Sequence, residues 1–199
     1  IISFIILVST TVCAQQPEDG IGGFQVKHML ETSQEWKNVN YADDDKAYHT
    51  CDIYLPKEKK KAYPVVVHIY GSAWFNNNGK GAADLGTIVN ALLNSGYAVV
   101  CPNHRSSADA HWPAQLHDIK AVVRFVRGAA GKYHFDPSFV ATCGFSSGGH
   151  LASVTAVTSG AKHAKVCGVE IDLEGSLGKY SKKSSAVNAA CDWSGPIDL

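Results

Sequence analysis

Apolar and polar positions along the chain follow two different periods, which predicts strands and helices in turn. Residues 51–55 alternate and end at a proline, as expected of a half-buried strand. More continuous apolar runs typical of strands buried on both faces cover 64–70, 97–101 and 139–143. Weaker runs at 24–30 and 186–191 predict a first and a sixth strand in this series.

Segments with helical spacing lie between the predicted strands. Between 85 and 93 the apolar residues recur every three or four positions, and Gly96 suits the position after a helix end. Pro113 begins a second predicted helix with an apolar stripe along one side. The polar residues off that stripe are His117, Asp118, Lys120, Arg124 and Arg127. A third helix, rich in small residues, is expected over 147–159, and a polar segment follows at 170–185.

This alternation of strand and helix predicts an α/β fold with a mainly parallel sheet flanked by helices. In such sheets, sites form at the carboxyl ends of the strands. Two of the predicted strand ends, at Tyr70 and Cys143, are followed directly by glycine. Both are therefore candidate positions for chemistry.

The first residues differ from the rest of the chain. Residues 1–12 are almost wholly apolar, and small residues up to Ala14 precede a polar stretch. This pattern predicts a secretory signal at 1–14, present only in part because it has no initiator methionine, followed by one domain over 15–199. The run is too short to span a membrane. We therefore expect export to the periplasm or the medium; a lipid anchor at Cys13 is disfavoured by the bulky Val12.

Charge and cysteine content narrow the function. Lys and Arg number 18, as do Asp and Glu, so no excess charge indicates binding to nucleic acid or to an anionic membrane. The basic run at 57–61 is interpreted as a solvated loop. Five cysteines follow the predicted signal, and those at 101 and 143 lie in apolar runs typical of buried thiols. No spacing suggests metal ligands, so neither a metal nor a cofactor is expected.

Gly144-Phe145-Ser146-Ser147-Gly148 matches the pattern GxSxG. In hydrolases this pattern places a nucleophilic serine on a strained turn between a strand and a helix. The predicted strand before the motif and the helix after it supply that context. Ser146 is therefore the candidate nucleophile, with Gly144 and Gly148 making room for the turn. A glycine-rich turn without chemistry is the alternative.

A second candidate element, Tyr70-Gly71-Ser72-Ala73-Trp74, follows the strand that ends at Tyr70. Acyl transfer needs N–H donors aimed at the oxyanion of the intermediate. One donor is expected from the backbone of Ser147 and the others from small residues of this loop, with Gly71 and Ser72 preferred. Tyr70 and Trp74 are candidate walls of an acyl pocket, although burial in the core accounts for them equally well.

Taken in order, four motifs resemble the esterase/lipase branch of the α/β hydrolases. They are His-Ile-Tyr-Gly-Ser-Ala-Trp, Pro-Asn-His-Arg-Ser-Ser, Trp-Pro-Ala-Gln-Leu-His-Asp and Gly-Phe-Ser-Ser-Gly-Gly-His-Leu-Ala. The chain is most similar, over about 52–199, to bacterial carbohydrate esterases of the BD-FAE type, which act on acetyl and feruloyl esters of xylan. The loop departs from the HGGGW of that family, with Tyr70 in place of His and one glycine of three.

The resemblance also implies a catalytic acid after a seventh strand and a histidine after an eighth. Both positions lie beyond Leu199, so the chain is expected to be truncated, without the last strands and without the acid and base of the triad. His150, Asp192 and Asp198 are weak substitutes within the chain. Earlier histidines, at 68, 104 and 111, precede the nucleophile and do not fit the usual order.

The expected function is therefore that of a serine carboxylic-ester hydrolase, acting on acetyl or feruloyl esters of plant polysaccharide. Its partner is a small-molecule or polysaccharide ester. One alternative is an amide hydrolase of the same fold, such as an arylformamidase or an exported serine peptidase. Another is a non-catalytic binding domain, and the chain by itself is expected to be an inactive fragment.

Overall fold

The computed structural model describes residues 30–82 and 84–197. The predicted signal at 1–14, nearly all of the strand predicted at 24–30, and Asp198 lie outside these residues. Within them, no helix is long and apolar enough to cross a bilayer. The basic loop at 57–61 is exposed, as predicted.

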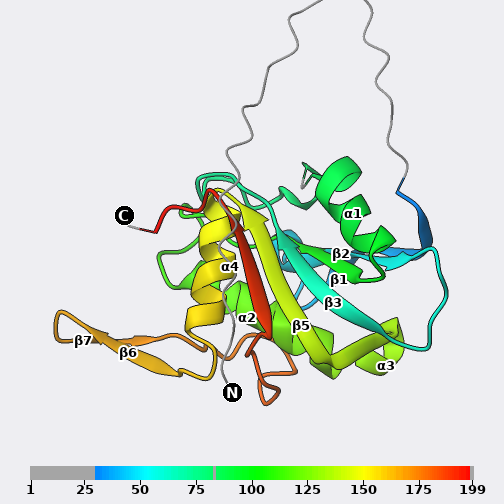
Figure 1. Ribbon diagram of the computed structural model, residues 1–199. Coiled ribbons are helices and arrows are strands. Elements are labelled where there is room, and N and C mark those ends of the chain that lie inside the picture. The colour runs from blue at the N-terminus through cyan, green and yellow to red at the C-terminus, as the bar shows by residue number, and fades with distance from the viewer. Residues whose placement is uncertain (1–29, 83, 198–199) are drawn as a thin grey trace, which may run out of the picture.

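Six strands form one sheet, and its order places the site. The order across the sheet is β1 (Thr32–Asn40), β2 (Thr50–Pro56), β4 (Ala98–Pro102), β3 (Tyr63–Ile69), β5 (Phe135–Phe145) and β8 (Ala189–Trp193). Strands β4, β3, β5 and β8 run parallel, whereas β1 and β2 are antiparallel. The prediction of an α/β fold with a mainly parallel sheet is confirmed, and β3 and β5 lie side by side (Figure 1).

Helices cover both faces of this sheet. Helices α2 (Ala114–Gly128) and α4 (Ser147–Val157) pack on one face, where they contact β3 and β5 as well as each other. Helix α1 (Asn90–Asn94), which continues a π-helical turn over Leu85–Val89, packs against β2 and β4. A short helix α3 (Ala130–Tyr133) precedes β5, and 3₁₀ turns cover Ala47–His49 and Lys80–Ala82.

Three strands of the structure were not predicted from the pattern of apolar positions. Strand β1 is an edge strand with a largely polar sequence, so it carries no clear strand signal. Strands β6 (His163–Val166) and β7 (Val169–Asp172) form a hairpin that projects from the body (Figure 1). Most of their residues are exposed, so alternation with a buried face is absent. The turn of this hairpin, Cys167–Gly168, has positive φ at both residues, as tight hairpin turns do.

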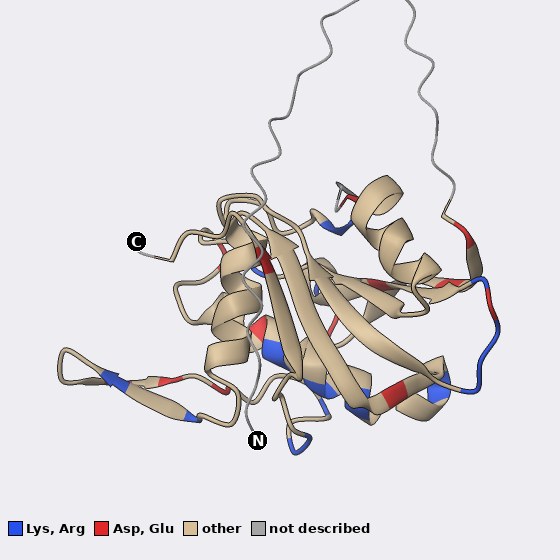
Figure 2. Cartoon of the chain, viewed as in Figure 1, with Lys and Arg blue, Asp and Glu red and all other residues tan. Residues whose placement is uncertain are grey.

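Helix α2 buries charged residues that lie off its apolar stripe. Asp118, Lys120 and Arg124 are all fully buried. Arg124 Nη1 lies 2.7 Å from Glu174 Oε1, and Lys120 Nζ lies 3.3 Å from Glu174 Oε2. Figure 2 shows basic and acidic positions along α2, behind the sheet. The ion pairs hold the segment around Glu174 against α2.

Candidate active site

Ser146 lies at the turn between β5 and α4, at the carboxyl end of a parallel strand. Its backbone has φ 53° and ψ −125°, a combination that L-residues rarely adopt. The Ser146 N–H donates to the carbonyl of Trp193 on β8, at 2.8 Å. The geometry is the strained strand-to-helix turn that GxSxG predicts. Strain of this kind persists only where surrounding contacts impose it, and such sites are usually functional.

The two glycines of the turn are required by backbone contacts. A Cβ at Gly148 would overlap the carbonyl oxygen of Ile69 and lie 2.6 Å from that of Tyr70. A Cβ at Gly144 would overlap the backbone of Gly148 and lie 2.7 Å from the Ile69 oxygen. The first turn of α4 therefore packs directly on the end of β3. This packing brings together the two strand ends that the sequence singled out.

The loop after β3 reaches Ser146 at Gly71. A Cβ there would lie 2.5 Å from the Phe145 carbonyl oxygen and 3.0 Å from Ser146 Cβ. The loop backbone and the serine are thus in direct contact. The second candidate element and the GxSxG turn form a single site.

The predicted oxyanion donors differ in whether their N–H groups already have a hydrogen-bond partner. Ser147 is the first residue of α4, where a backbone N–H has no partner within the helix. The Ser72 N–H donates to Ser147 Oγ at 2.9 Å. For Ser72 to serve an oxyanion, this N–H must be shared or must turn away from the hydroxyl. The roles of Gly71, Ser72 and Ser147 as donors remain predictions.

The remainder of the loop is held in a left-handed conformation. Ala73 and Trp74 have φ of 48° and 62°. The Trp74 carbonyl accepts a hydrogen bond of 2.8 Å from the Ser107 N–H, and the Ser72 carbonyl accepts one of 3.0 Å from Phe75. These bonds fix a conformation that would otherwise favour glycine.

Tyr70 is not a wall of the pocket at this site. Its side chain is buried and stacks on His104, with ring centroids 4.8 Å apart. The hydroxyl donates to the Asn76 carbonyl at 2.8 Å. Burial raises the pKa of Tyr70 to about 12, so the hydroxyl stays protonated. Tyr70 therefore supports the loop from below, which corrects its assignment to the pocket.

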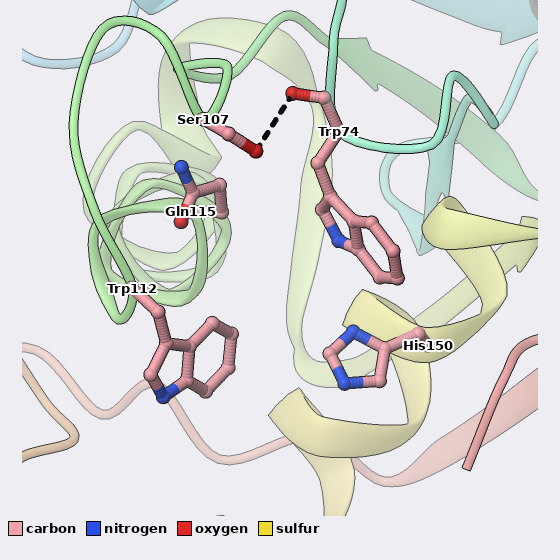
Figure 3. Close-up of a pocket in the computed structure, with 5 residues that line it drawn as sticks. All are labelled: Trp74, Ser107, Trp112, Gln115 and His150. Atoms are coloured by element: carbon pink, nitrogen blue, oxygen red, sulfur yellow. Dashed lines mark hydrogen bonds between the residues drawn. The ribbon is translucent and has the colours of Figure 1, made fainter. Parts of the chain in front are cut away.

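Trp74, in contrast, does line a pocket, of about 280 Å³. Figure 3 shows its ring facing His150 and Trp112 across this space, with Ser107 and Gln115 completing the wall. The His150 ring lies 5.2 Å from that of Trp74 and 5.8 Å from that of Trp112, between centroids. Ser107, Trp112 and Gln115 lie in two of the motifs that resemble the esterase family, but neither motif supplies the candidate nucleophile or the expected oxyanion donors, so none of the three was predicted to line the site.

A buried ion pair anchors the loop that carries Ser107 and Trp112. Asp118 accepts hydrogen bonds from Arg105 Nη2 at 2.6 Å and from the Arg105 N–H at 2.8 Å. His49 Nε2 lies 3.4 Å from the same carboxylate. Burial by itself raises the pKa of Asp118, but His49 and Arg105 outweigh burial and hold the pKa below its ordinary value. The carboxylate therefore stays charged and ties residue 105 to α2.

Within the described residues, no histidine or carboxylate hydrogen bonds with the Ser146 hydroxyl. Asp192 is engaged elsewhere, accepting from Ser153 Oγ and from the Gly195 N–H, both at 2.7 Å. His150 lies one turn beyond Ser146, and its Nδ1 is buried without a hydrogen-bond partner. His68 and His104 bond to Cys143 Sγ and the Arg105 carbonyl, and His111 is exposed. No cluster able to hold a metal ion occurs among the residues described.

The chain is similar to known esterases in both sequence and structure. The BD-FAE family model matches residues 51–199. A solved structure described as a truncated carbohydrate esterase from gut microbiota is 50% identical, with a TM-score of 0.83, covering 85% of this chain and 59% of that one. A bifunctional GH43-CE protein of Bacteroides eggerthii is 48% identical, with a TM-score of 0.81, covering 86% of this chain and 24% of that one.

Curated relatives match over shorter stretches. The probable carboxylic ester hydrolase LipM of Mycobacterium tuberculosis (strain ATCC 25618 / H37Rv) is 36% identical over 95 residues, 48% of this chain and 22% of that protein. A probable isoprenylcysteine alpha-carbonyl methylesterase of Oryza sativa subsp. japonica is 28% identical over 132 residues, 66% of this chain and 31% of that protein. The chain thus spans less than a third of the length of these relatives.

Proposed function

The chain belongs to the BD-FAE family and has the α/β-hydrolase fold, and from this premise we propose that it carries the nucleophile of a serine carboxylic-ester hydrolase. One observation carries the proposal: the strained turn that presents Ser146 is in contact with the loop at Gly71. A protein without acyl chemistry has no need to hold a serine in this conformation.

The proposed reaction has two steps. Ser146 Oγ attacks the ester carbonyl while its proton passes to a base. The oxyanion that forms is stabilised by the N–H of Ser147, at the start of α4, together with N–H groups of the loop after β3. Collapse expels the alcohol, which takes the proton, and leaves an acyl group on Ser146. Water then attacks this ester, releases the acid and restores the serine, and no cofactor takes part.

The position of the base is inferred by elimination. None of the described histidines hydrogen bonds with Ser146 Oγ, and the Asp192 carboxylate is occupied by Ser153 and Gly195. We therefore propose that the base lies outside the described residues. His150 is assigned to the pocket instead, where its ring faces Trp74.

The proposed substrates are acetyl or feruloyl esters of plant polysaccharide. Support comes from the BD-FAE match and from a structure at 50% identity that is described as a carbohydrate esterase. Export to the periplasm or the medium is part of the proposal, since plant polysaccharides lie outside the cell. It rests on the apolar run at 1–12 and the small residues before Gln15.

The test compares Ser146→Ala with Ser95→Ala in the whole protein, using p-nitrophenyl acetate and acetylated xylan. Among the described residues, Ser95 Oγ donates only to the Ala91 carbonyl, at the C-terminal end of α1, which makes it a matched serine remote from the site. Loss of the nucleophile should lower kcat by at least about a thousandfold. Retained activity in Ser146→Ala refutes the proposal. Activity confined to formylated amines or peptides assigns the same site to amide hydrolysis.

A further inference from the structure

The pocket lined by Trp74, Ser107, Trp112, Gln115 and His150 is hereafter called the tryptophan pocket. We propose that it binds a neutral sugar ring belonging to the alcohol part of the ester. The proposal rests on the proposed esterase function and adds to it the group that the enzyme recognises beside the bond it cleaves. Four observations support it: the position of the pocket beside Ser146, the chemistry of its lining, the hydrogen bonds that hold its walls and the exposure of its rim.

The tryptophan pocket lies next to the reacting serine, because two of its residues come from the elements that contact Ser146. Trp74 ends the loop that touches Ser146 at Gly71. His150 lies on α4 one turn after Ser146, and its N–H donates to the Ser146 carbonyl at 3.0 Å. Helical side chains lean toward the helix N-terminus, so the His150 ring extends toward the turn that carries the serine. A group bound in this pocket is therefore close to the ester bond.

The lining combines flat apolar faces with unused polar atoms. Indole rings present broad apolar faces, and Trp112 is 45% exposed, which is unusual for so large an apolar side chain. The C–H face of a pyranose matches such a surface. Its hydroxyls need partners, and the exposed Ser107 hydroxyl, which donates to the Trp74 carbonyl at 3.3 Å, can still accept a hydrogen bond. Gln115 uses its amide nitrogen on the carbonyls of Ser106 and Ala110, which leaves its oxygen free to accept.

The absence of positive charge disfavours an anionic ligand. Among the five lining residues, only His150 has an ionisable side chain. Burial lowers the pKa of His150, and the nearby Asp192 opposes this shift only in part. The imidazole is therefore neutral under ordinary conditions. A carboxylate or phosphate would find no cation in this lining, whereas a neutral polyol finds both donors and acceptors.

The walls are held rigid before any ligand binds. The Ser107 N–H donates to the Trp74 carbonyl at 2.8 Å, which joins the two loops that form the pocket. Gln115 Nε2 spans the carbonyls of Ser106 and Ala110, at 3.1 and 2.8 Å. Arg105 ties the same loop to Asp118. Walls fixed in this way lose little conformational entropy on binding.

Openness favours a sugar of the leaving group over an aromatic acyl group. Trp112 stands at the rim with nearly half of its surface in water. A hydroxycinnamoyl ring gains most from complete removal from water. A sugar ring that belongs to a polysaccharide needs an open cleft through which the chain continues. The volume of about 280 Å³ is near the lower end of ligand pockets and suits a single ring.

The test uses Trp112→Ala in the whole protein, with Phe75→Ala as the matched control. Phe75 is 80% exposed and adjoins Trp74 in sequence, but does not line the tryptophan pocket. Because Trp112 is at the rim, its removal should leave folding intact. On acetylated xylo-oligosaccharide, kcat/KM should fall about tenfold, mainly through KM, as expected for one lost aromatic contact. Activity on p-nitrophenyl acetate should not change, and Trp112→Phe should restore most of the loss.

Other outcomes overturn the proposal in distinct ways. An equal loss on p-nitrophenyl acetate assigns Trp112 a structural role. A loss confined to methyl ferulate places the acyl ring in the pocket. An unchanged KM for the oligosaccharide means that no sugar binds there. Calorimetric titration of unacetylated xylo-oligosaccharide into Ser146→Ala and into Ser146→Ala/Trp112→Ala tests the pocket even if the esterase assignment fails, and equal affinities for both proteins reject it.

Discussion

Two backbone segments meet at Ser146, and they are built in different ways. In the turn 144–148, glycine is required at both ends because a Cβ would strike the backbone of the neighbouring strand end. In the loop 70–74, only Gly71 is under this constraint. The loop nevertheless places Ala73 and Trp74 in a conformation that favours glycine.

The difference lies in what imposes the strained conformation. The turn is fixed by its own backbone packing against Ile69 and Tyr70. The loop is fixed by hydrogen bonds: Ser147 Oγ accepts from the Ser72 N–H, and the Trp74 carbonyl accepts from the Ser107 N–H. Close backbone packing therefore holds one half of the site, and hydrogen bonds hold the other half. The following predictions test this division.

The largest effect is expected from Asp118→Asn, which removes the charge that anchors Arg105. Asp118 is fully buried but Arg105 is 23% exposed, so loss of the pair should lower the free energy of unfolding by about 2–4 kcal/mol, less than for a fully buried pair. Activity should fall as well, because the loop that holds Trp74 through Ser107 is released. Urea unfolding measures the effect, with the exposed Asp45→Asn as the control. Equal stabilities for the two variants would show that the loop does not depend on this ion pair.

The same carboxylate predicts a dependence of stability on pH. The pKa of Asp118 is lower in the folded protein than in the unfolded chain, so its contribution is present above the unfolded value, near pH 4. That contribution is lost as the pH falls through the folded pKa. Stability should therefore drop on acidification from pH 5 to pH 3, and less steeply in Asp118→Asn. Parallel curves for parent and variant would contradict the assignment.

Gly148→Ala tests the half of the site that is held by backbone packing, the turn 144–148. The added methyl meets two backbone carbonyls that cannot rotate away, so stability should fall by about 1–3 kcal/mol and activity should be lost. Gly131→Ala is the matched control, since a Cβ there meets nothing within 4 Å. Thermal unfolding and ester hydrolysis measure the two effects. An active, stable Gly148→Ala protein would mean that the turn can relax.

The smallest effect is expected from Ala73→Gly, and its sign is opposite. Glycine relieves the left-handed strain at φ 48° but loses more entropy on folding, so the net gain should be about 0.5 kcal/mol. The same change at Ala91, an exposed position in α1, should cost about 1 kcal/mol. A loss at both positions would show that the loop conformation is not strained.

Features with a signal in neighbouring residues could be predicted from sequence, and features that depend on distant partners could not. Strands β2 to β5 follow from their apolar runs, and the Ser146 turn follows from two glycines at fixed spacing. Strand β1 and the β6–β7 hairpin have no buried face to leave an alternating pattern. The buried charges at Asp118 and Arg124 resemble surface residues in sequence, because their partners Arg105 and Glu174 are distant.

The tryptophan pocket could not be predicted for the same reason. Its walls come from the loop after β3, the segment before α2, the first turn of α2 and the first turn of α4, and no local spacing links them. Tyr70 was open to two interpretations, a pocket wall or a residue buried in the core. The structure favours burial, because the ring is buried and stacks on His104.

The central claim is that Ser146 is the residue that becomes acylated, and covalent labelling tests it most directly. The whole protein is treated with a fluorophosphonate, digested and analysed by mass spectrometry. We predict one adduct, on the peptide that contains Ser146, and none in Ser146→Ala. An adduct on Ser72 or Ser147, or no adduct in a protein that hydrolyses p-nitrophenyl acetate, would contradict the claim.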